Sequence, residues 1–315
     1  MIIVTGGAGF IGSNLVRALN RAGHDDIVVV DNLTNAEKCR NLNRCRFIDL
    51  IDKRDFLGRL QTFRGVRAVM HQGACSSTTE KDGRYLLENN IDYSKRLLAW
   101  TQEINAAFIY ASSASVYGNG DDGFADDRPA CEYPLNGYAF SKWVFDNHVR
   151  RLAAGFRAQV VGLRWFNVYG PHEHHKGGQC SPMLHFHRQL TSDGKLKLFA
   201  GSDGFRRDFV HVEDCCAVAM HFLVNPHVSG IYNCGTSTAR SFAEVAQLMI
   251  ARYPGAAIDE VPFPEQFKGK YQAYTCAELT RLRAAGYAKP FLPLDQGLAS
   301  YVDLLRSPNA GYLPA

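Results

Sequence analysis

Tyr138 and Lys142 are four residues apart in the stretch GYAFSKWVFDNHV, which has the periodicity of an amphipathic helix. Side chains at positions i and i+4 share one helical face, so the phenol and the ammonium can project into one site. A tyrosine ionises at about pH 10, and a neighbouring lysine cation favours its phenolate. Such a phenolate can take the proton of an alcohol while a cofactor takes the hydride. The pair therefore predicts an acid–base centre for alcohol oxidation, although an exposed helical pair has the same spacing.

The stretch PHEHHKGG, residues 171–178, holds three histidines, a glutamate and a lysine. Histidine and glutamate are zinc ligands, but the stretch has no HxxxH pair and no other standard zinc spacing. We therefore predict no metal site here. A solvated basic loop and a catalytic use of Lys176 both stay open at this point.

Residues 1–34, MIIVTGGAGFIGSNLVRALNRAGHDDIVVVDNLT, have the pattern strand, tight turn, helix, strand. Gly6, Gly9 and Gly12 stand where a pyrophosphate would approach the amide groups of the helix start. Asp31 ends the next strand, where an acidic residue binds the ribose hydroxyls of NAD and repels the 2′-phosphate of NADP. Lys38 and Lys53 are either solvated surface residues or candidates to neutralise that phosphate. The sequence predicts dinucleotide binding, and these residues alone leave NAD and NADP open.

Strand and helix patterns go on alternating to about residue 166. VRAVMHQGACSS predicts a strand and a loop, residues 84–103 a long helix, and AAFIYASSASVYG a further strand and loop. This alternation is typical of a doubly wound parallel sheet, whose ligands lie beyond the carboxyl ends of the strands. Ser113 follows such a strand, where its hydroxyl can bond the reacting oxygen or only cap a turn.

The composition is that of an ordinary globular chain: 315 residues, 46% hydrophobic, with 35 Lys and Arg against 31 Asp and Glu. A net charge of +4 is too small to indicate a nucleic-acid or membrane-surface partner. Nine cysteines without a CxxC pair favour free thiols in a reducing cytoplasm. Neither a signal-peptide pattern nor a bilayer-spanning apolar stretch is present in the sequence. We expect a soluble cytoplasmic protein with no nucleic-acid and no membrane partner.

Several motifs give the chain a resemblance to a known superfamily. TGGAGFIG, YASSASVYG, YAFSK, RWFNVYGP and RRDFVHVEDC are similar to motifs of the extended short-chain dehydrogenases/reductases, which modify nucleotide sugars. More narrowly, GACSSTTEKDGRYLLENN, NVYGPHEHHKG and FKGKYQAYT resemble the ADP-glyceromanno-heptose 6-epimerase family. The resemblance covers nearly the whole chain. It implies an α/β fold, with a Rossmann-type doubly wound parallel sheet and a smaller C-terminal α/β substrate domain.

The resemblance also implies a domain organisation. We expect the NADP-binding domain at residues 1–166, about 208–235 and 286–306, with the final helix packed on this larger domain. The substrate-binding domain would comprise residues 167–207 and 236–285. Members of the family are homo-oligomers, so a homo-oligomer, and by resemblance a pentamer, is implied here.

The implied reaction is a redox-neutral isomerisation. Bound NADP⁺ oxidises the C6″ hydroxyl of ADP-D-glycero-β-D-manno-heptose to a ketone, and hydride returns to the opposite face. The product, ADP-L-glycero-β-D-manno-heptose, is the heptose precursor of the lipopolysaccharide core. A ketone that turns about C5″–C6″ carries its oxygen away from the first proton donor, so a second acid–base group is needed. The resemblance assigns Tyr138 and Lys176 as the two bases, with Lys142 and Ser113 completing the catalytic set.

Other functions on this fold remain alternatives, because a fold does not fix a function. Dehydration is disfavoured, since Ala114 and Ser115 cannot protonate a leaving hydroxyl. A UDP-sugar 4-epimerase needs only the tyrosine and leaves Lys176 unexplained. A net dehydrogenase of a nucleotide sugar is a further alternative, and a non-catalytic NADP-binding regulator is one from a different class.

The resemblance extends to the cofactor contacts. They fall on Gly6, Gly9, Phe10, Ile11, Gly12, Asp31, Asn32, Lys38, Lys53, Gln72, Gly73, Ala74, Cys75, Ser76, Asn89, Lys142, Val168 and Lys176. Gln72 departs from the glutamate common in the family. The matches at Asn32 and Lys38 favour tightly bound NADP, one per subunit, with NAD as the alternative.

Substrate contacts are implied at Ser113, Asn167, Gly178, His185, Phe199, Ala200, Gly201, Ser202, Arg207 and Tyr271. Arg207 suits a diphosphate because its guanidinium offers a rigid fork of donors. An ion pair with Asp208 or Glu213 is the structural alternative for this arginine. His185 also fits a plain helix-face histidine. Gly178 and Ala200 replace larger residues of the family, so side-chain contacts at these two positions are in question.

Overall fold

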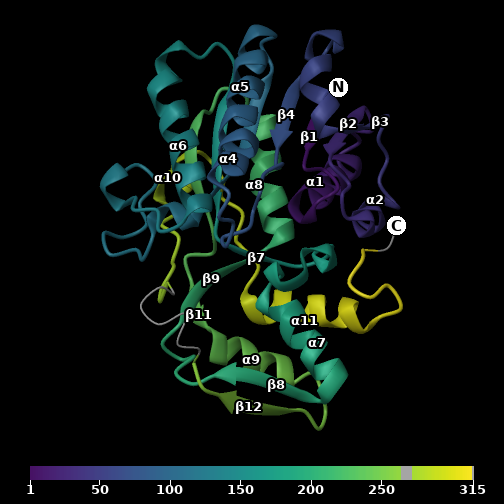
Figure 1. Cartoon of the computed structure of the whole chain (residues 1–315), viewed down its shortest axis with the longest axis vertical. Helices are drawn as coiled ribbons and strands as arrows, with labels where there is room; N and C mark the ends of the chain where they lie inside the picture. Colours follow the sequence, from purple (N-terminus) through teal and green to yellow (C-terminus); the bar gives the residue numbers. More distant parts are fainter. Residues whose placement is uncertain (264–271, 314–315) are drawn as a thin grey trace.

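The centre of the molecule is a seven-stranded parallel sheet in the order β10-β6-β5-β4-β1-β2-β3 (Figure 1). The computed structural model describes residues 1–263 and 272–313. The strands of this sheet are β1 (Ile2–Thr5), β2 (Ile27–Asp31), β3 (Asp49–Asp52), β4 (Ala68–His71), β5 (Ala107–Ser113), β6 (Val160–Trp165) and β10 (Gly230–Cys234). The predicted doubly wound α/β fold is confirmed.

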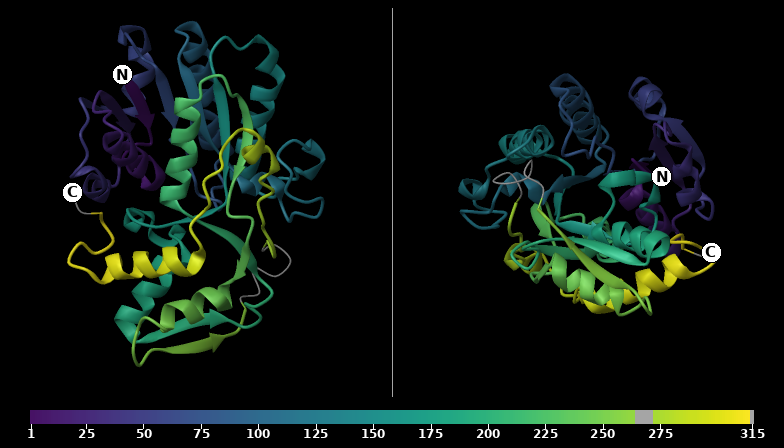
Figure 2. Two further views of the ribbon diagram at one scale, coloured as in Figure 1. Left: turned by 180° about the vertical axis from the view of Figure 1, so that it is seen from behind. Right: turned by 60° about the horizontal axis from the view of Figure 1, so that its bottom comes forward.

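Helices cover both faces of the sheet (Figures 1 and 2). α1 (Phe10–Arg21) and α8 (Val212–Val224) lie on one face, and α5 (Tyr93–Glu103) and α6 (Gly137–Leu152) lie on the other. Ile2 and Val4 enter one buried cluster and Ile3 the other, because successive side chains of a strand point to opposite faces. Burial of both faces explains the uninterrupted apolar runs of the sequence.

The helix expected over residues 84–103 is a run of three joined pieces. α4 (Gly83–Leu86) leads into a turn of π-helix (Leu87–Asp92), which leads into α5. Two further short helices of the first half of the chain are α2 (Cys39–Leu42) and α3 (Lys53–Phe56). Turns of 3₁₀-helix lie at Ala36–Lys38, Leu57–Thr62, Ala114–Tyr117, Pro129–Cys131, Ala153–Gly155 and His174–Gln179.

Two smaller sheets form the lower part of the molecule in Figure 1. One is three-stranded, in the order β11-β9-β7, with β7 (Asn167–Tyr169), β9 (Arg206–His211) and β11 (Ala239–Ser241). The other pairs β8 (Lys195–Phe199) in parallel with β12 (Ala257–Val261). α7 (Pro182–Asp193) and α9 (Phe242–Ile250) pack beside these strands.

The packing differs from the expected domain boundaries at both C-terminal helices. α11 (Leu294–Arg306) was expected on the larger domain, but its apolar face joins the buried cluster of α7 and α9, because Leu298 and Tyr301 fill the space beside Leu184 and Val245. α10 (Thr280–Ala284), expected in the substrate domain, packs instead against β10. The expected boundary at residues 207 and 208 falls inside β9, which pairs with β7 and β11. The division into two domains itself stays a prediction.

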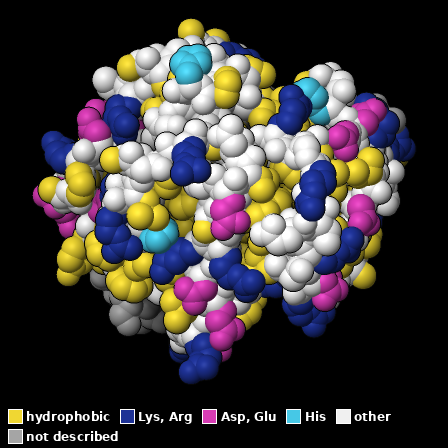
Figure 3. All heavy atoms as spheres, turned by 90° about the horizontal axis from the view of Figure 1, so that it is seen from above, with side chains coloured by type: hydrophobic (Ala, Val, Ile, Leu, Met, Phe, Trp, Pro, Cys, Tyr) yellow, Lys and Arg dark blue, Asp and Glu magenta, His cyan; other side chains and the backbone are white. Residues whose placement is uncertain are grey.

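On the face shown in Figure 3, basic and acidic side chains are interspersed. Among the helices of residues 1–263 and 272–313, none combines the length and the hydropathy that crossing a membrane requires.

Candidate active site

A glycine turn opens the site at the carboxyl end of β1. Gly6 has φ +64°, a conformation that side-chain-bearing residues rarely adopt. A Cβ atom at Gly12 would lie 2.1 Å from the carbonyl oxygen of Gly6, so only glycine fits there. Gly9 precedes the first turn of α1 without a capping side chain, which leaves the amide groups of that turn to a ligand. The turn has the form of a pyrophosphate cradle, as the glycine spacing predicts.

Asp31, at the end of β2, holds the glycine turn and carries a lysine. One carboxylate oxygen accepts from the Ala8 amide at 3.1 Å, and the other accepts from Lys38 Nζ at 2.9 Å. Lys38 Nζ also donates to the Asn32 side-chain oxygen at 3.1 Å. The carboxylate that could repel a 2′-phosphate is therefore partly neutralised by a cation on the same side of the site.

Lys53 lies across from this group, after β3. Its ammonium donates to the side-chain oxygen of Asn89 and lies 5.9 Å from the ring centre of Tyr85. Burial lowers the pKa of Lys53. A second cation thus faces the same part of the cavity, and Tyr85 is a lining residue that the sequence did not single out.

Tyr138 and Lys142 project from the first turns of α6 toward the end of β5. Lys142 is buried, and its Nζ donates to the carbonyl oxygen of Ala111 at 2.7 Å. Burial lowers the pKa of Lys142 to about 8. Burial also raises the pKa of Tyr138, and a hydrogen bond with the Ser113 hydroxyl works in the opposite direction. Desolvation is thus the main influence on the Tyr138 pKa in this structure, and the help that a lysine cation gives to the phenolate stays a prediction.

Asn90 ties the loop after β4 to α6. Its side-chain oxygen accepts from the Cys75 amide at 2.8 Å, and its amide group donates to the Cys75 carbonyl at 3.0 Å and to the Ser141 hydroxyl at 2.9 Å. Asn90 lies in the π-helical turn, so the irregular winding there carries its side chain inward. Asn90 could not be found from the sequence, since a single asparagine within a helical pattern gives no local signal.

Lys176 lies in the 3₁₀ turn after β7, with Nζ 5.5 Å from the centre of the Phe10 ring at the start of α1. The loop around it is held by Glu173, which is fully buried. The Glu173 carboxylate accepts from the Ser181 amide at 2.5 Å, the Ser181 hydroxyl at 2.6 Å and the Tyr301 hydroxyl at 3.0 Å. Burial raises the pKa of Glu173, and these hydrogen bonds oppose the rise.

The three histidines of this loop make structural contacts. Leu313 N donates to Nε2 of His172 at 3.2 Å, and its Nδ1 lies 3.1 Å from the Ser13 hydroxyl, so the ring is neutral with its proton on Nδ1. Burial lowers the pKa of His172 to about 3. His174 stacks on Tyr312 with ring centres 5.2 Å apart. His175 Nδ1 lies 3.2 Å from the Asn41 amide group, and burial lowers its pKa to about 4.

No group of three or more histidine, cysteine, aspartate or glutamate side chains with metal-binding geometry is found among the described residues. The three histidines of the loop turn in different directions, toward α1 and the C-terminal segment, toward Tyr312 and toward α2. The predicted absence of a zinc site stays a prediction, and the histidines have an account that needs no metal.

These groups line one cavity of about 410 Å³ at the carboxyl ends of β1, β2, β4 and β5. Tyr138, Lys142, Lys176 and every residue predicted to contact the cofactor except Val168 line it. Ser113 reaches the cavity through its hydrogen bond with Tyr138. The lining residues that the sequence analysis did not name are Thr5, Val30, Ser77, Tyr85, Tyr93, Ala111, Ser112, Trp165, His175 and Gln179. Among them, Trp165 donates to the Gln72 side chain at 3.2 Å, which fixes both at the end of the sheet.

Apart from Ser113, the described residues that were predicted to bind substrate are not among those that line this cavity. Arg207 is buried in β9, where its guanidinium donates to the backbone carbonyls of Arg206 (2.9 Å) and Gln272. His185 is exposed on α7, 2.8 Å from the Gln189 amide group. Asn167 lies 3.4 Å from the Thr275 hydroxyl. Gly178 is exposed, Phe199 is the last residue of β8, and Ala200, Gly201 and Ser202 lie in the turn that follows it. Tyr271 lies outside the described residues.

Comparisons with known proteins bear on this site. The model of a family described as "NAD dependent epimerase/dehydratase family" matches residues 2–235. The ADP-L-glycero-D-manno-heptose-6-epimerase of Brachyspira hyodysenteriae is 50% identical over 319 aligned positions, covering 99% of this chain and 100% of the relative.

Two solved structures extend the comparison. The ADP-L-glycero-D-manno-heptose-6-epimerase of Helicobacter pylori superimposes with a TM-score of 0.85 at 28% identity, covering 97% of this chain and 96% of that one. The UDP-glucose 4-epimerase of Thermus thermophilus, solved in complex with NAD, superimposes with a TM-score of 0.80 at 27% identity, covering 98% and 99%.

Proposed function

The chain belongs to the NAD dependent epimerase/dehydratase family, and we propose that within it the chain interconverts ADP-D-glycero-β-D-manno-heptose and ADP-L-glycero-β-D-manno-heptose at C6″. The relative from Brachyspira hyodysenteriae that is named for this activity is aligned over almost the full length of both chains. The observation that carries the chemistry is that Tyr138 and Lys176, on separate elements, line a single cavity. If the ketone turns about C5″–C6″ before hydride returns, its oxygen leaves the reach of the first proton carrier, so this reaction needs a second one.

The cavity suits a nicotinamide cofactor, which would supply hydride transfer to and from the substrate carbon when bound. The glycine turn would hold the pyrophosphate, since a Cβ atom at Gly6 or Gly12 would fill that space. We propose NADP rather than NAD, tightly held and one per subunit. The support is charge: Lys38 is paired with Asp31, and Lys53 is a second cation of the same cavity.

Within this cavity each catalytic side chain has a proposed task. Tyr138 exchanges a proton with the C6″ oxygen in one orientation of the substrate, and Lys176 does so in the other. Ser113 bonds the same oxygen and Tyr138. Lys142 supplies a positive charge on the same face of α6 as the phenol, and this charge favours the phenolate.

The ADP-heptose would extend from the cavity toward the smaller sheets. Asn167, Gly178, His185, Arg207 and the turn 199–202 are proposed contacts there. For Arg207 to bind the diphosphate, phosphate oxygens would replace the backbone carbonyls that its guanidinium now binds. The product would supply lipopolysaccharide core synthesis in the cytoplasm, from a homo-oligomer, a pentamer by resemblance.

The test is to incubate the purified protein, with no cofactor added, with ADP-D-glycero-β-D-manno-heptose. The two C6″ epimers are resolved by chromatography while absorbance of reduced nicotinamide is followed. Interconversion without net reduction is expected. Bulk reduction would indicate a net dehydrogenase. No interconversion, even with NADP⁺ supplied, would overturn the heptose assignment, and UDP-sugar 4-epimers would then be tried.

A further inference from the structure

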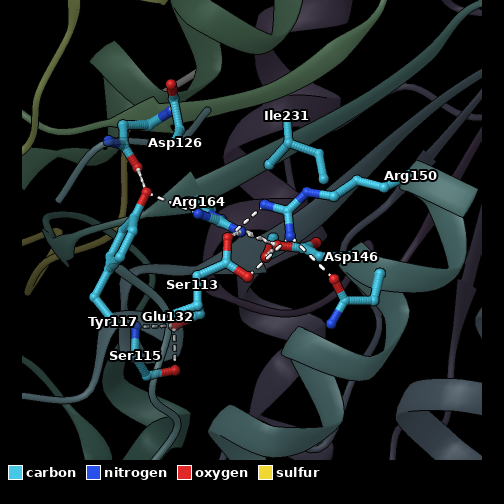
Figure 4. A network of polar contacts seen from close by, with 12 residues as sticks. Ser113, Ser115, Tyr117, Asp126, Glu132, Asp146, Arg150, Arg164 and Ile231 are labelled. Atoms are coloured by element: carbon cyan, nitrogen blue, oxygen red, sulfur yellow. Dashed lines mark hydrogen bonds and ion pairs between the residues drawn. The ribbon is translucent and has the colours of Figure 1, made fainter. Parts of the chain in front are cut away.

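A network of buried charges lies between α6 and strands β5 and β6 of the central sheet (Figure 4). Arg164, on β6, is fully buried. Its guanidinium donates to Asp146 Oδ2 through Nε at 3.0 Å and Nη2 at 2.9 Å, and to Glu132 Oε1 at 2.5 Å. Arg150 binds the same Glu132, with Nη1 2.8 Å from Oε2. Two carboxylates and two guanidinium groups therefore balance in the interior.

Asp146 connects this network to the strand that holds Lys142. Its Oδ1 accepts from the Tyr110 hydroxyl at 2.9 Å, and its Oδ2 accepts from the Ser112 hydroxyl at 2.9 Å. Tyr110 and Ser112 flank Ala111, the residue whose carbonyl receives the Lys142 ammonium at 2.7 Å. Asp146 also follows Lys142 by one helical turn on α6. One carboxylate thus fixes both sides of the peptide that the lysine binds.

The negative charge of Asp146 also stabilises the ammonium form of Lys142. The titratable groups that interact with the Lys142 charge are Asp146 on its own helix, Cys75 after β4 and His71 on β4. Burial lowers the pKa of Lys142, and Asp146 is the larger of the two charges that oppose this. Without Asp146, Arg150 and Arg164 would outnumber Glu132, and the buried region next to the ammonium would carry an uncompensated positive charge.

We propose that Asp146 is a positioning residue of the reaction: it holds the Ala111 carbonyl and the positive charge of Lys142 in place. It acts through Lys142 and has no contact of its own with substrate. The catalytic meaning of this inference rests on the proposed function, but the placement and charge of Lys142 are measurable without any substrate.

The experiment compares Asp146→Asn with the parent enzyme as purified, using ε-¹³C-labelled lysine. The Lys142 resonance is assigned with Lys142→Arg, and its titration is followed by NMR. We expect the Lys142 midpoint to fall by about 1 pH unit or more in Asp146→Asn. The ammonium is the active form, so the alkaline limb of the kcat profile should move to lower pH by a similar amount. An unchanged midpoint would overturn the proposal.

Glu132→Gln is the matched control, because it removes the same charge from the same network without touching β5. It should lower Tm while moving the Lys142 midpoint less than Asp146→Asn does. An equal shift of the Lys142 midpoint in both variants would contradict the assignment to Asp146.

If Asp146→Asn does not fold, a second experiment uses the double variant Tyr110→Phe and Ser112→Ala. It keeps the charge of Asp146 and removes the two hydroxyl groups that anchor β5 to it. It should lower kcat at least threefold with KM little changed; unchanged kcat would overturn the anchoring role.

The proposed function can fail independently of this inference. A parent enzyme that shows no epimerisation but loses Lys142 charge in Asp146→Asn would reject the function and keep the placement. A parent enzyme that epimerises the substrate, but whose Lys142 midpoint does not change in Asp146→Asn, would keep the function and reject the role of Asp146.

Discussion

The two proposed bases stand on very different supports. Tyr138 and Lys142 lie on a long helix packed on the central sheet, and the ammonium of Lys142 is bound by a carbonyl of strand β5. Lys176 lies in a short turn that the central sheet does not hold. Its loop is tied to Ser13 of α1, to Asn41 of α2, to Tyr301 of α11 and to the C-terminal residues 311–313.

The two bases are therefore held in place in two different ways: Tyr138 by the packing of α6 on the central sheet, and Lys176 by single contacts from other segments, which we call tethers. The first base is fixed by the same burial and strand packing that stabilise the sheet, so its position follows from folding itself. The second is fixed by contacts from segments far apart in the sequence. Weakening one such contact should therefore affect the Lys176 side of the site alone.

The largest loss of turnover is expected when Tyr138, the base on the helix of the central sheet, is replaced. Tyr138→Phe keeps the ring and deletes the proton carrier, so turnover of both epimers should fall by roughly 10²- to 10⁴-fold. The bound nicotinamide should be retained, as measured by absorbance of the denatured supernatant. Tyr133→Phe is the matched control, because Tyr133 is 74% exposed, and it should leave turnover unchanged. Near-normal turnover in Tyr138→Phe would contradict the role of Tyr138 as one of the two bases.

Lys176→Met tests the tethered base. It removes the ammonium while keeping an unbranched side chain over Phe10, and turnover should fall by roughly 10²-fold or more. Lys195→Met, at an exposed position of β8, serves as the control and should behave as the parent enzyme does. Equal activity of the two lysine variants would mean that the loop is a solvated basic segment.

Tyr301→Phe tests the tether without touching the cavity. It removes the hydroxyl that donates to Glu173, a hydrogen bond to a buried carboxylate that contributes about 1.5–3 kcal/mol. We expect a lower Tm and a several-fold loss of turnover. Tyr232→Phe loses a comparable hydroxyl contact, to the Ser229 carbonyl, on the central sheet, and should change turnover little. If both variants lose turnover alike, tethering has no special role.

The smallest effect at neutral pH concerns His172. Its pKa is about 3 in the folded chain against 6.5 for an unperturbed ring, so the unfolded chain takes up a proton that the folded one refuses. Stability contributed by the neutral ring is present above pH 6.5 and is lost as pH falls toward 3, by about 1.4 kcal/mol per pH unit. His172→Gln should flatten this part of the stability profile in melts between pH 7 and 5. An unchanged slope would contradict the buried neutral ring.

The sequence predicted well what depends on local spacing. The glycine turn, Asp31 at a strand end and the Tyr138–Lys142 pair follow from patterns within a few residues, and the structure places all of them at one cavity. The raised pKa of Tyr138 could not be predicted, because spacing cannot tell how far the phenol is desolvated.

What the sequence did not predict depends on contacts between distant segments. Asn90 binds Cys75 and Ser141 across 15 and 51 residues, and the motifs that contain these partners do not indicate the contact. The expected packing of α11 on the larger domain failed for a similar reason. An amphipathic pattern predicts that one face of a helix is buried, but not which surface covers that face. The histidines of residues 171–178 have the side-chain types of a zinc site. Their structural role could not be predicted, because the residues they contact, such as Ser13 and Leu313, lie far away in the sequence.

The most direct test of the two-base account gives each epimer separately to Tyr138→Phe and to Lys176→Met and follows a single turnover at the absorbance of reduced nicotinamide. Each variant lacks one proton carrier, so each should oxidise one epimer and fail with the other. The account predicts opposite preferences: the epimer that reduces the cofactor in one variant should be inert in the other. If Tyr138→Phe fails with both epimers while Lys176→Met oxidises both, a single base serves the reaction and the role given to Lys176 is contradicted.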